Sequence, residues 1–205
     1  GCEFCHARAA ADDPARHGAA QIEAEIDAAV AKGATELVLT GGEPLLRTEL
    51  EGWIRRACAA GARVLVETNG TLLSVDDRAA ALARAGLARV RVGVNGWGEE
   101  ADALARLRGA WRWTERGIAA ALDADLEVEI SLALGAANLS AVAQLPRQLA
   151  GAFGGLQGLL LRFISEAPAA HLAAWPELAA AALGLAQACR DVNLPLRVDP
   201  GHSLP

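Results

Sequence analysis

The chain has 205 residues, of which 53% are hydrophobic and 21% are charged, and its formal net charge at pH 7 is −6. A chain of this length and apolar content can bury one large core, so we expect a single domain. Its acidic balance, without a basic cluster, argues against nucleic acid held through phosphates and against an anionic membrane surface. No transmembrane run or signal-like segment is visible, so a soluble cytoplasmic protein is the default expectation.

Two of the four cysteines, Cys2 and Cys5, form a Cys-x-x-Cys pair in a segment that is expected to be a loop. Two thiolates brought to one point suit a metal ion, a cluster or a redox pair. A zinc site would need a second pair of ligands, for which His6 is the nearest candidate. The other cysteines, Cys58 and Cys189, lie in helical patterns and are expected to be small buried hydrophobes.

Runs of apolar residues predict that helices and strands alternate along the rest of the chain, as in a repeated βαβ unit. The first half is expected to hold a helix from an N-cap at Asp13 to Gly33, a strand at 36–40, a helix from Thr48 to Gly61, a strand at 63–68, a helix opened by a capping box of Ser74 and Asp77 and ending near Gly86, and a strand at 88–94. The second half is expected to hold helices near 100–108 and from Thr114 to about Asp123, a strand at 127–134, a helix at 139–152, a strand at 159–164, a helix near 171–191 and an extended segment at 196–199.

Polar residues follow successive strands of this pattern. Glu43 comes after the first strand, Thr68 and Asn69 end the second, and Asn95 follows the third. Right-handed crossovers build a parallel sheet that stays open or curls into a barrel, and functional residues at the carboxyl ends of its strands are typical of barrel enzymes. The strand at 88–94 alternates valine with arginine, so we expect it to lie near an edge or to have one wet face.

The turn after the first strand is the segment most suited to a ligand. Gly41 and Gly42 let the backbone approach a ligand closely, and Pro44 stiffens the turn after Glu43. Taken alone, Glu43 could equally be a solvated residue in a strand-to-helix turn.

Three motifs, in this order, resemble those of radical S-adenosylmethionine enzymes. Cys2-Glu3-Phe4-Cys5 resembles the last two cysteines of the loop Cys-x-x-x-Cys-x-aromatic-Cys, and residues 40–47 resemble the glycine-rich motif. Residues 67–73 resemble the Thr-Asn-Gly-Thr stretch of the branch that contains the molybdenum-cofactor GTP cyclase, the sulfatase-maturating enzymes and the peptide maturases. Similar residues also occur at 106–109, 114–118 and Asn138, so the resemblance covers about residues 1–165.

The resemblance implies that Cys2 and Cys5, with a third cysteine, hold three irons of a [4Fe-4S] cluster. The fourth iron would bind the amino and carboxylate groups of S-adenosyl-L-methionine. The turn 41–44 would bind the amino group through a backbone carbonyl and the Glu43 carboxylate, because an ammonium is a pure donor. The other expected contacts are Thr68 and Asn69 as polar groups, Arg108 at the ligand carboxylate, Asn95 at the ribose or substrate, and Ile130, Leu132 and Phe163 beside the adenine.

In this family one electron cleaves the carbon–sulfur bond to give methionine and a 5′-deoxyadenosyl radical, which takes a hydrogen atom from the substrate. The resemblance therefore implies an electron donor, such as a flavodoxin or a ferredoxin. The substrate is expected to be a peptide first, and a small molecule or nucleotide of a cofactor pathway second.

The sequence also departs from the family. The first cluster cysteine would lie three residues before Gly1, and the chain contains no methionine. We therefore expect residues 1–205 to be a truncated radical enzyme core, a parallel partial (β/α)6 barrel without its N-terminal strand, inactive by itself. Gly93 and Asn95 stand where the branch commonly has serine and aspartate, and no cysteine-rich extension is present before Pro205. Two alternatives stay open: a degenerate scaffold without cluster chemistry, and a barrel enzyme that uses zinc or no metal.

Overall fold

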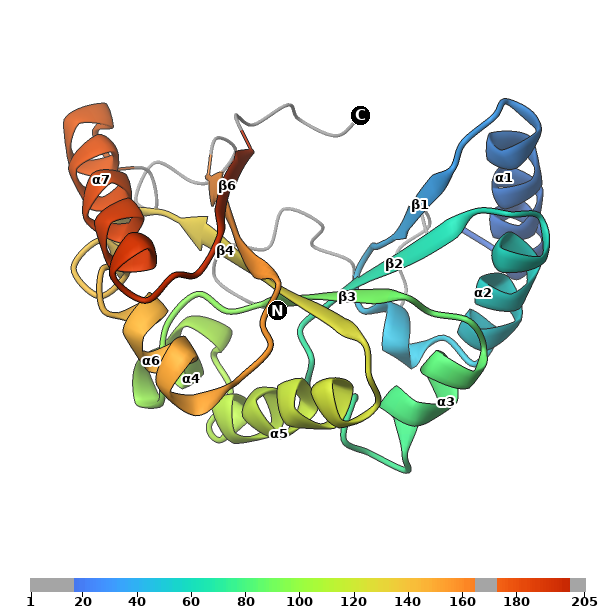
Figure 1. The fold of residues 1–205 in the computed structure, drawn as a ribbon, viewed down its shortest axis with the longest axis horizontal. Coiled ribbons are helices and arrows are strands. Elements are labelled where there is room, and N and C mark those ends of the chain that lie inside the picture. The colour runs from blue at the N-terminus through green and yellow to red at the C-terminus, as the bar shows by residue number, and fades with distance from the viewer. Residues whose placement is uncertain (1–16, 165–172, 200–205) are drawn as a thin grey trace.

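Six parallel strands lie side by side in chain order and form one curved sheet with helices on its convex side (Figure 1). The structure, a computed structural model, describes residues 17–164 and 173–199. The strands are β1 Glu36–Leu39, β2 Arg63–Thr68, β3 Arg89–Gly93, β4 Glu127–Leu134, β5 Gly158–Phe163 and β6 Leu196–Asp199. The helices are α1 Ala19–Ala31, α2 Leu50–Ala59, α3 Arg78–Arg84, α4 Glu99–Ala105, α5 Ala110–Asp123, α6 Leu145–Ala152 and α7 Trp175–Asp191, with short 3-10 turns η1 Pro44–Leu46 and η2 Ala136–Asn138. The predicted parallel partial (β/α)6 barrel is confirmed.

One face of each central strand is packed against the helices. Val66, Val92, Ile130 and Leu161 are 0% exposed and share one hydrophobic core with helix residues such as Ile118. Burying a side chain of this size contributes about 1.5–3 kcal/mol relative to leaving it in water. This layer therefore fixes the curvature of the sheet and the place of the helices.

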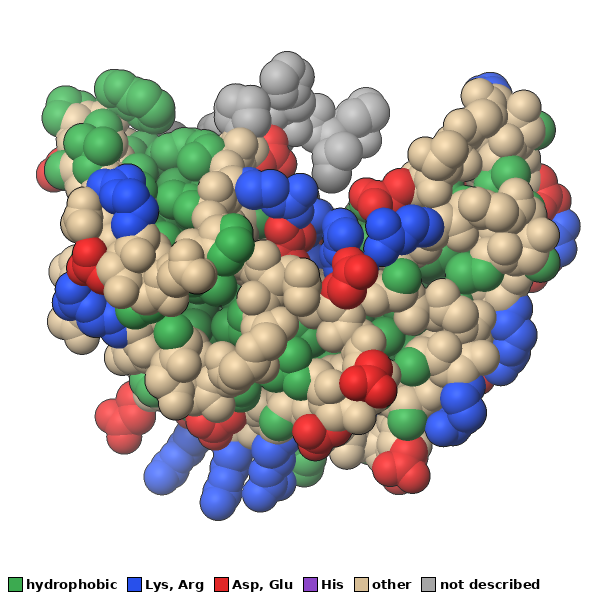
Figure 2. All heavy atoms as spheres, viewed as in Figure 1, with side chains coloured by type: hydrophobic (Ala, Val, Ile, Leu, Met, Phe, Trp, Pro, Cys, Tyr) green, Lys and Arg blue, Asp and Glu red, His purple; other side chains and the backbone are tan. Residues whose placement is uncertain are grey.

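The other face of the same strands, on the concave side, carries charged side chains. Glu67 of β2, Arg91 of β3, Glu129 of β4, Arg162 of β5 and Arg197 of β6 alternate with the buried apolar residues, because successive side chains of a strand point to opposite faces. Acidic and basic side chains gather between the two ends of the curved sheet in Figure 2. Strand β3 lies in the middle of the sheet, so its alternation reflects a wet face and not an edge.

The carboxyl ends of the strands lie along a single edge of the sheet, because all pairings are parallel. Leu39 pairs with Val66, and Thr68 pairs with Val92. The turns after β1 and β2, and Asn95 after β3, therefore lie at this same edge.

Helix α3 begins later than predicted. Asp76 and Asp77 have φ of 49° and 53°, in the left-handed region that a right-handed helix does not contain. Asp77 directly precedes the helix and makes no side-chain cap bond. The predicted capping box of Ser74 and Asp77 is therefore wrong.

Helices α1 and α6 are also shorter than predicted. Helix α1 follows Gly18, whose backbone is extended, and the predicted cap Asp13 lies outside the described residues. Helix α6 begins at Leu145 with Pro146 in its first turn, where a missing N–H costs nothing. The preceding residues form turns after η2, so Pro146 was the signal for the true start.

Candidate functional site

The carboxylate of Glu43 is fixed by three hydrogen bonds at the end of β1. Its Oε1 accepts from the backbone N–H of Leu45 at 3.0 Å and from the hydroxyl of Thr68 at 2.7 Å. Its Oε2 accepts from the backbone N–H of Asn69 at 2.9 Å. Glu43 therefore caps η1 and ties the turn after β1 to the turn after β2.

The turn that follows β2 is held tightly from within. Asn69 Oδ1 accepts from the backbone N–H of Thr71 at 2.9 Å and from its hydroxyl at 2.7 Å, as in an Asx turn. The N–H of Gly70 donates to Thr68 Oγ1 at 3.0 Å. Gly70 has φ of 79°, and a Cβ there would lie 2.8 Å from a methyl of Val92. Only glycine suits this position. The close packing of Gly70 on Val92 therefore helps to fix the turn whose Asn69 N–H donates to Glu43.

Thr68 has a different role from the expected direct contact to a ligand. The residue is 5% exposed, its hydroxyl proton is given to Glu43, and its oxygen accepts from Gly70. It is therefore placed to orient the Glu43 carboxylate. The neighbouring Asn69 is exposed and stays a candidate contact.

Asn95 joins the ends of β3 and β4. Its Oδ1 accepts from the backbone N–H of Ala133 at 2.8 Å, and its backbone carbonyl accepts from Nδ2 of Asn138 at 2.9 Å. Asn138 is 0% exposed and also bonds the carbonyl of Ala133 and the N–H of Gly135. Asn95 is half-buried at the same edge as Glu43, and its role as a ligand contact stays a prediction.

Arg108 lies in the turn between α4 and α5 and is exposed. Its charge contributes to lowering the pKa of Asp102, although hydrogen bonds from the backbone N–H groups of Trp111 and Gly109 lower that pKa more. Within the described residues, Arg108 makes no hydrogen bond to Glu43, Thr68 or Asn69. Its predicted contact to the ligand carboxylate stays a prediction.

Ile130 and Leu132 do not reach the candidate site. Both are 0% exposed and lie in the core between β4 and the helices, so neither side chain can contact an adenine without unpacking. This corrects the expectation that they line the adenine. The intervening residues of β4, Ser131 and Ala133, face the concave side. Phe163 is half-buried and packs against the ring of Trp175.

The concave face is crossed by a network of ion pairs that none of the sequence motifs indicated. Arg91 lies between Glu129, at 2.7 Å, and Glu67, at 3.4 Å. Arg162 of β5 pairs with Glu67 of β2 and so spans the two strands between them. Arg197 of β6 pairs with Glu129. The signal was available, because each residue stands at a polar position of an alternating strand.

Glu129 is the most buried member of this network, with 4% exposure. Burial alone raises the pKa of its carboxyl, but hydrogen bonds from Arg197 and Arg91 outweigh that effect, so the pKa lies below its ordinary value. A buried carboxylate paired in this way is stable only while both arginines remain. The network therefore gives the barrel a polar floor whose charges are satisfied internally.

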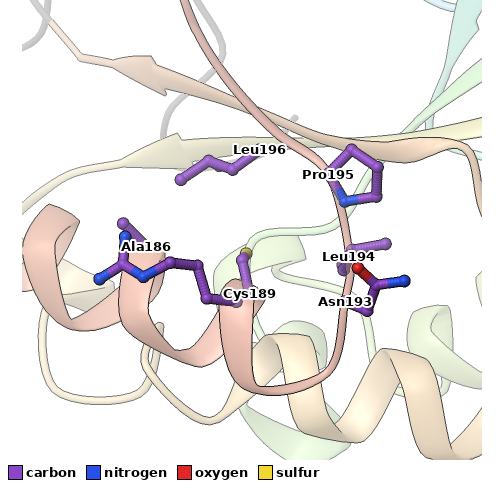
Figure 3. A pocket seen from close by; sticks show the side chains of 7 residues that line it. Ala186, Cys189, Asn193, Leu194, Pro195 and Leu196 are labelled. Atoms are coloured by element: carbon purple, nitrogen blue, oxygen red, sulfur yellow. The ribbon is translucent and has the colours of Figure 1, made fainter.

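One hollow, of about 390 Å³, lies at the far edge of the sheet (Figure 3). It is lined by Cys189 and Arg190 of α7 and by the segment 193–196, which leads into the amino end of β6. The carboxyl ends of the strands, with Glu43, lie at the opposite edge. Burial raises the pKa of Cys189 to about 11, so its thiol stays protonated at neutral pH. This sulfur is a packing group, as predicted.

Among residues 17–164 and 173–199, no group of three or more His, Cys, Asp or Glu residues is arranged to hold a metal ion. Cys2 and Cys5 lie outside the described residues. In the same described part, no helix combines the length and apolar character needed to span a membrane.

Comparison with protein families decides the class. The model of the radical SAM superfamily matches residues 1–137, about two thirds of the 205-residue chain. The chain belongs to the radical SAM superfamily. The resemblance of the cysteine pair, the glycine-rich turn and the Thr-Asn-Gly-Thr stretch is thereby confirmed at the level of the family.

Relatives of this radical SAM chain include a probable GTP 3′,8-cyclase of Aeropyrum pernix, which is 35% identical over an alignment of 141 residues; the match covers 65% of this chain and 39% of the relative. Streptococcus suis SuiB, solved with its precursor peptide SuiA, has a TM-score of 0.79 at 12% identity over 98% of this chain and 46% of SuiB. The protein anSMEcpe, solved with AdoMet bound, has a TM-score of 0.74 at 14% identity over 96% of this chain and 60% of that one. The chain thus spans about two fifths of the curated relative, and the structural likenesses concern the fold.

The residues around Glu43 fit the amino group of S-adenosylmethionine. A carboxylate offers about four acceptor positions, and the three hydrogen bonds that Glu43 accepts from described residues leave one position, on Oε2, without a donor among those residues. Gly41 and Gly42 are exposed beside it, and a Cβ at Gly41 would meet nothing within 4 Å. This edge of the radical SAM barrel therefore offers open space and an unused acceptor to an ammonium group.

Proposed function

We propose that this chain is the core of a radical SAM enzyme in which Glu43 binds the amino group of S-adenosyl-L-methionine. The observation that carries the proposal is the pair of fixed carboxylate oxygens at the carboxyl edge of the sheet. Thr68 and Asn69 hold Glu43 at 2.7 and 2.9 Å, so the acceptor is oriented before the ligand arrives. Such preorganisation lowers the cost of ordering groups on binding.

The cofactor set proposed for the full protein follows from family membership. Cys2 and Cys5 would supply two thiolates of a [4Fe-4S] cluster, since soft sulfur is the usual ligand of such iron. When bound, the cluster and S-adenosylmethionine together supply a one-electron cleavage of a carbon–sulfur bond and a hydrogen-atom abstraction from substrate. A one-electron carrier of the cytoplasm, such as a flavodoxin or a ferredoxin, would donate the electron to the cluster.

The chain's own residues would bind S-adenosylmethionine and orient it. Glu43 and the exposed turn at Gly41 and Gly42 would fix the amino acid end of the ligand, and Arg108 would meet its carboxylate. Asn95, and the Ser131 side chain that faces the concave side, would meet the ribose. The ion pair of Glu67 and Arg162 would hold the charged side chains of the concave face in place below the ligand.

The substrate class is proposed from the more similar relatives. A probable GTP 3′,8-cyclase is 35% identical over 141 residues, whereas the peptide-bound neighbour is 12% identical. This favours a nucleotide or other small molecule of a cofactor pathway over a peptide. The order of the two substrate classes expected from sequence is therefore reversed in our proposal.

Anaerobic reconstitution of the full gene product with iron and sulfide tests this proposal. The expected result is visible absorption from sulfur-to-iron charge transfer and, on reduction with dithionite, release of 5′-deoxyadenosine from S-adenosylmethionine. Cluster formation without release would favour a degenerate scaffold. A colourless protein that retains zinc would favour the zinc alternative, and either result would reject the proposal.

A further inference from the structure

Helix α5 contacts the turn that holds Glu43, although none of its residues was expected to touch the ligand. The hydroxyl of Thr114 donates to the backbone carbonyl of Asn69 at 3.1 Å. Thr114 is only 8% exposed. In a helix, a threonine hydroxyl commonly bonds a carbonyl of its own preceding turn. The Thr114 hydroxyl instead bonds a carbonyl 45 positions away in the chain.

A second contact from the same helix lies one turn further along. Gly117 packs so closely on the turn that a Cβ there would lie 2.0 Å from the carbonyl oxygen of Gly70. Real Cβ atoms do not approach an oxygen this closely, so any larger residue must push the turn or the helix away. Thr114 thus bonds the carbonyl of Asn69, and Gly117 packs against the carbonyl of the next residue, Gly70.

The geometry points to α5 as the element that positions the Glu43 carboxylate, with Thr114 and Gly117 as positioning residues for the amino group of S-adenosylmethionine. The route is short. Thr114 fixes the carbonyl of Asn69, whose N–H donates to Glu43 Oε2. Gly117 fixes Gly70, whose N–H bonds the Thr68 hydroxyl that donates to Oε1. Oε2 is therefore linked to α5 through Asn69, and Oε1 is linked to α5 through Thr68 and Gly70.

This inference rests on the proposed function, because it assumes that Glu43 binds the ligand. It goes further by assigning a positioning role to residues of α5, none of which was among the expected ligand contacts. A merely structural role for Thr114 would affect folding and all ligands equally. A positioning role would affect only ligands that carry the amino group.

The test compares Thr114→Val, which keeps the shape and removes the donor, with Thr114→Ser, which keeps the donor. Both are made in the full-length, anaerobically reconstituted protein and measured well below their melting temperatures. Thr114→Val is expected to raise the Kd for S-adenosylmethionine about fivefold to tenfold, as for loss of one hydrogen bond. Thr114→Ser is expected to restore the Kd to within about twofold of wild type. The Kd for 5′-methylthioadenosine, which lacks the amino acid moiety, is expected to stay unchanged in both.

A second arm uses Glu43→Gln as the background. If Thr114 acts through Glu43, Thr114→Val adds little to the loss already caused by Glu43→Gln, because residues of one network are not additive. Gly117→Ala should weaken S-adenosylmethionine binding in the same selective way, but the test is decided on Thr114 if this variant does not fold.

The outcomes separate the two claims. A wild-type protein that does not bind S-adenosylmethionine, or an unchanged Kd in Glu43→Gln, overturns the proposed function. A weakened Glu43→Gln with an unaffected Thr114→Val overturns only the role of α5. Equal losses for S-adenosylmethionine and 5′-methylthioadenosine in Thr114→Val would also overturn it, since they would indicate a general structural effect.

Discussion

The hydroxyl of Thr68 donates a hydrogen bond of 2.7 Å to Oε1 of Glu43, so strand β2 holds the carboxylate that follows strand β1. The two residues are 25 positions apart in the chain and meet because Glu43 follows β1 and Thr68 ends the adjacent parallel strand β2. A short hydrogen bond to a carboxylate is stronger than one between neutral groups. It fixes the rotamer of Glu43 before any ligand is bound.

Replacing Thr68 by valine should weaken the binding of S-adenosylmethionine without abolishing it. The variant loses one charge-assisted donor, for which about 1.5–3 kcal/mol is usual, and leaves the N–H of Gly70 without its acceptor. We expect a Kd raised at least about tenfold by equilibrium dialysis of the reconstituted protein. Thr68→Ser, which keeps the hydroxyl, is the matched control, and equal binding by the valine and serine variants would contradict this role.

Glu43→Gln should also weaken the binding of S-adenosylmethionine, since it removes the negative charge that faces the ligand's ammonium. A charged hydrogen bond of this kind contributes about 1.5–3 kcal/mol, so S-adenosylmethionine affinity should fall about 10-fold to 100-fold. Glu49→Gln is the control, because Glu49 lies nearby but pairs with Arg47. Wild-type affinity in Glu43→Gln, or an equal loss in Glu49→Gln, would show that the carboxylate is not the acceptor.

Much of this fold could be predicted because strands and helices differ in period. Strands β2 and β4 were predicted with the bounds that the structure has, since each is an apolar run between clear turn signals. The start of α3 could not be predicted, because the spacing of Ser74 and Asp77 is that of a capping box. The backbone of Asp76 and Asp77 instead lies in the left-handed region. Local propensity there gives way to the backbone conformation of the turn.

The candidate site was predictable only in part. The turn at Glu43 and the stretch at Thr68 carry motifs, and parallel topology brings such residues to one edge. Which side chain faces the ligand depends on the side of the strand, and this was misjudged for Ile130 and Leu132. The contact of Thr114 with Asn69 joins residues 45 positions apart through one hydroxyl, and no periodicity reveals such a bond.

Asn138 should be important for stability at the same edge. Its side chain is 0% exposed and bonds Asn95, Ala133 and Gly135, so Asn138→Ala leaves buried backbone groups without partners. We expect a loss of about 2–3 kcal/mol in the free energy of unfolding, measured by urea titration. Gln144→Ala, at an exposed residue without a side-chain cap bond, should change it by less than about 0.5 kcal/mol. Equal losses in the two variants would contradict the bridging role.

Glu129→Gln should destabilise the barrel in a pH-dependent way. Removing this charge leaves Arg91 and Arg197 without a common partner, at a cost of about 2–3 kcal/mol at pH 7, less than for a fully buried pair because Arg197 is exposed.

The sign of the pH dependence follows from the lowered pKa of Glu129. A depressed folded-state pKa means that the stabilisation is present above the ordinary pKa of 4.5 and is lost as pH falls through the folded value. The difference between wild type and Glu129→Gln should therefore shrink between pH 5 and the acid limit of folding, as followed by urea titrations at several pH values. Glu99→Gln, at an exposed carboxylate, should match wild type throughout. A difference that stays constant down to the lowest pH would contradict the ion-pair account.

The most direct measurement is a structure of the full gene product, reconstituted without oxygen and bound to S-adenosylmethionine. The ligand's amino nitrogen is predicted to lie within hydrogen-bonding distance of Glu43 Oε2, at the carboxyl edge of the sheet and on the same side as the sulfurs of Cys2 and Cys5. An amino group bound elsewhere, or cysteine sulfurs at the amino ends of the strands, would contradict the account.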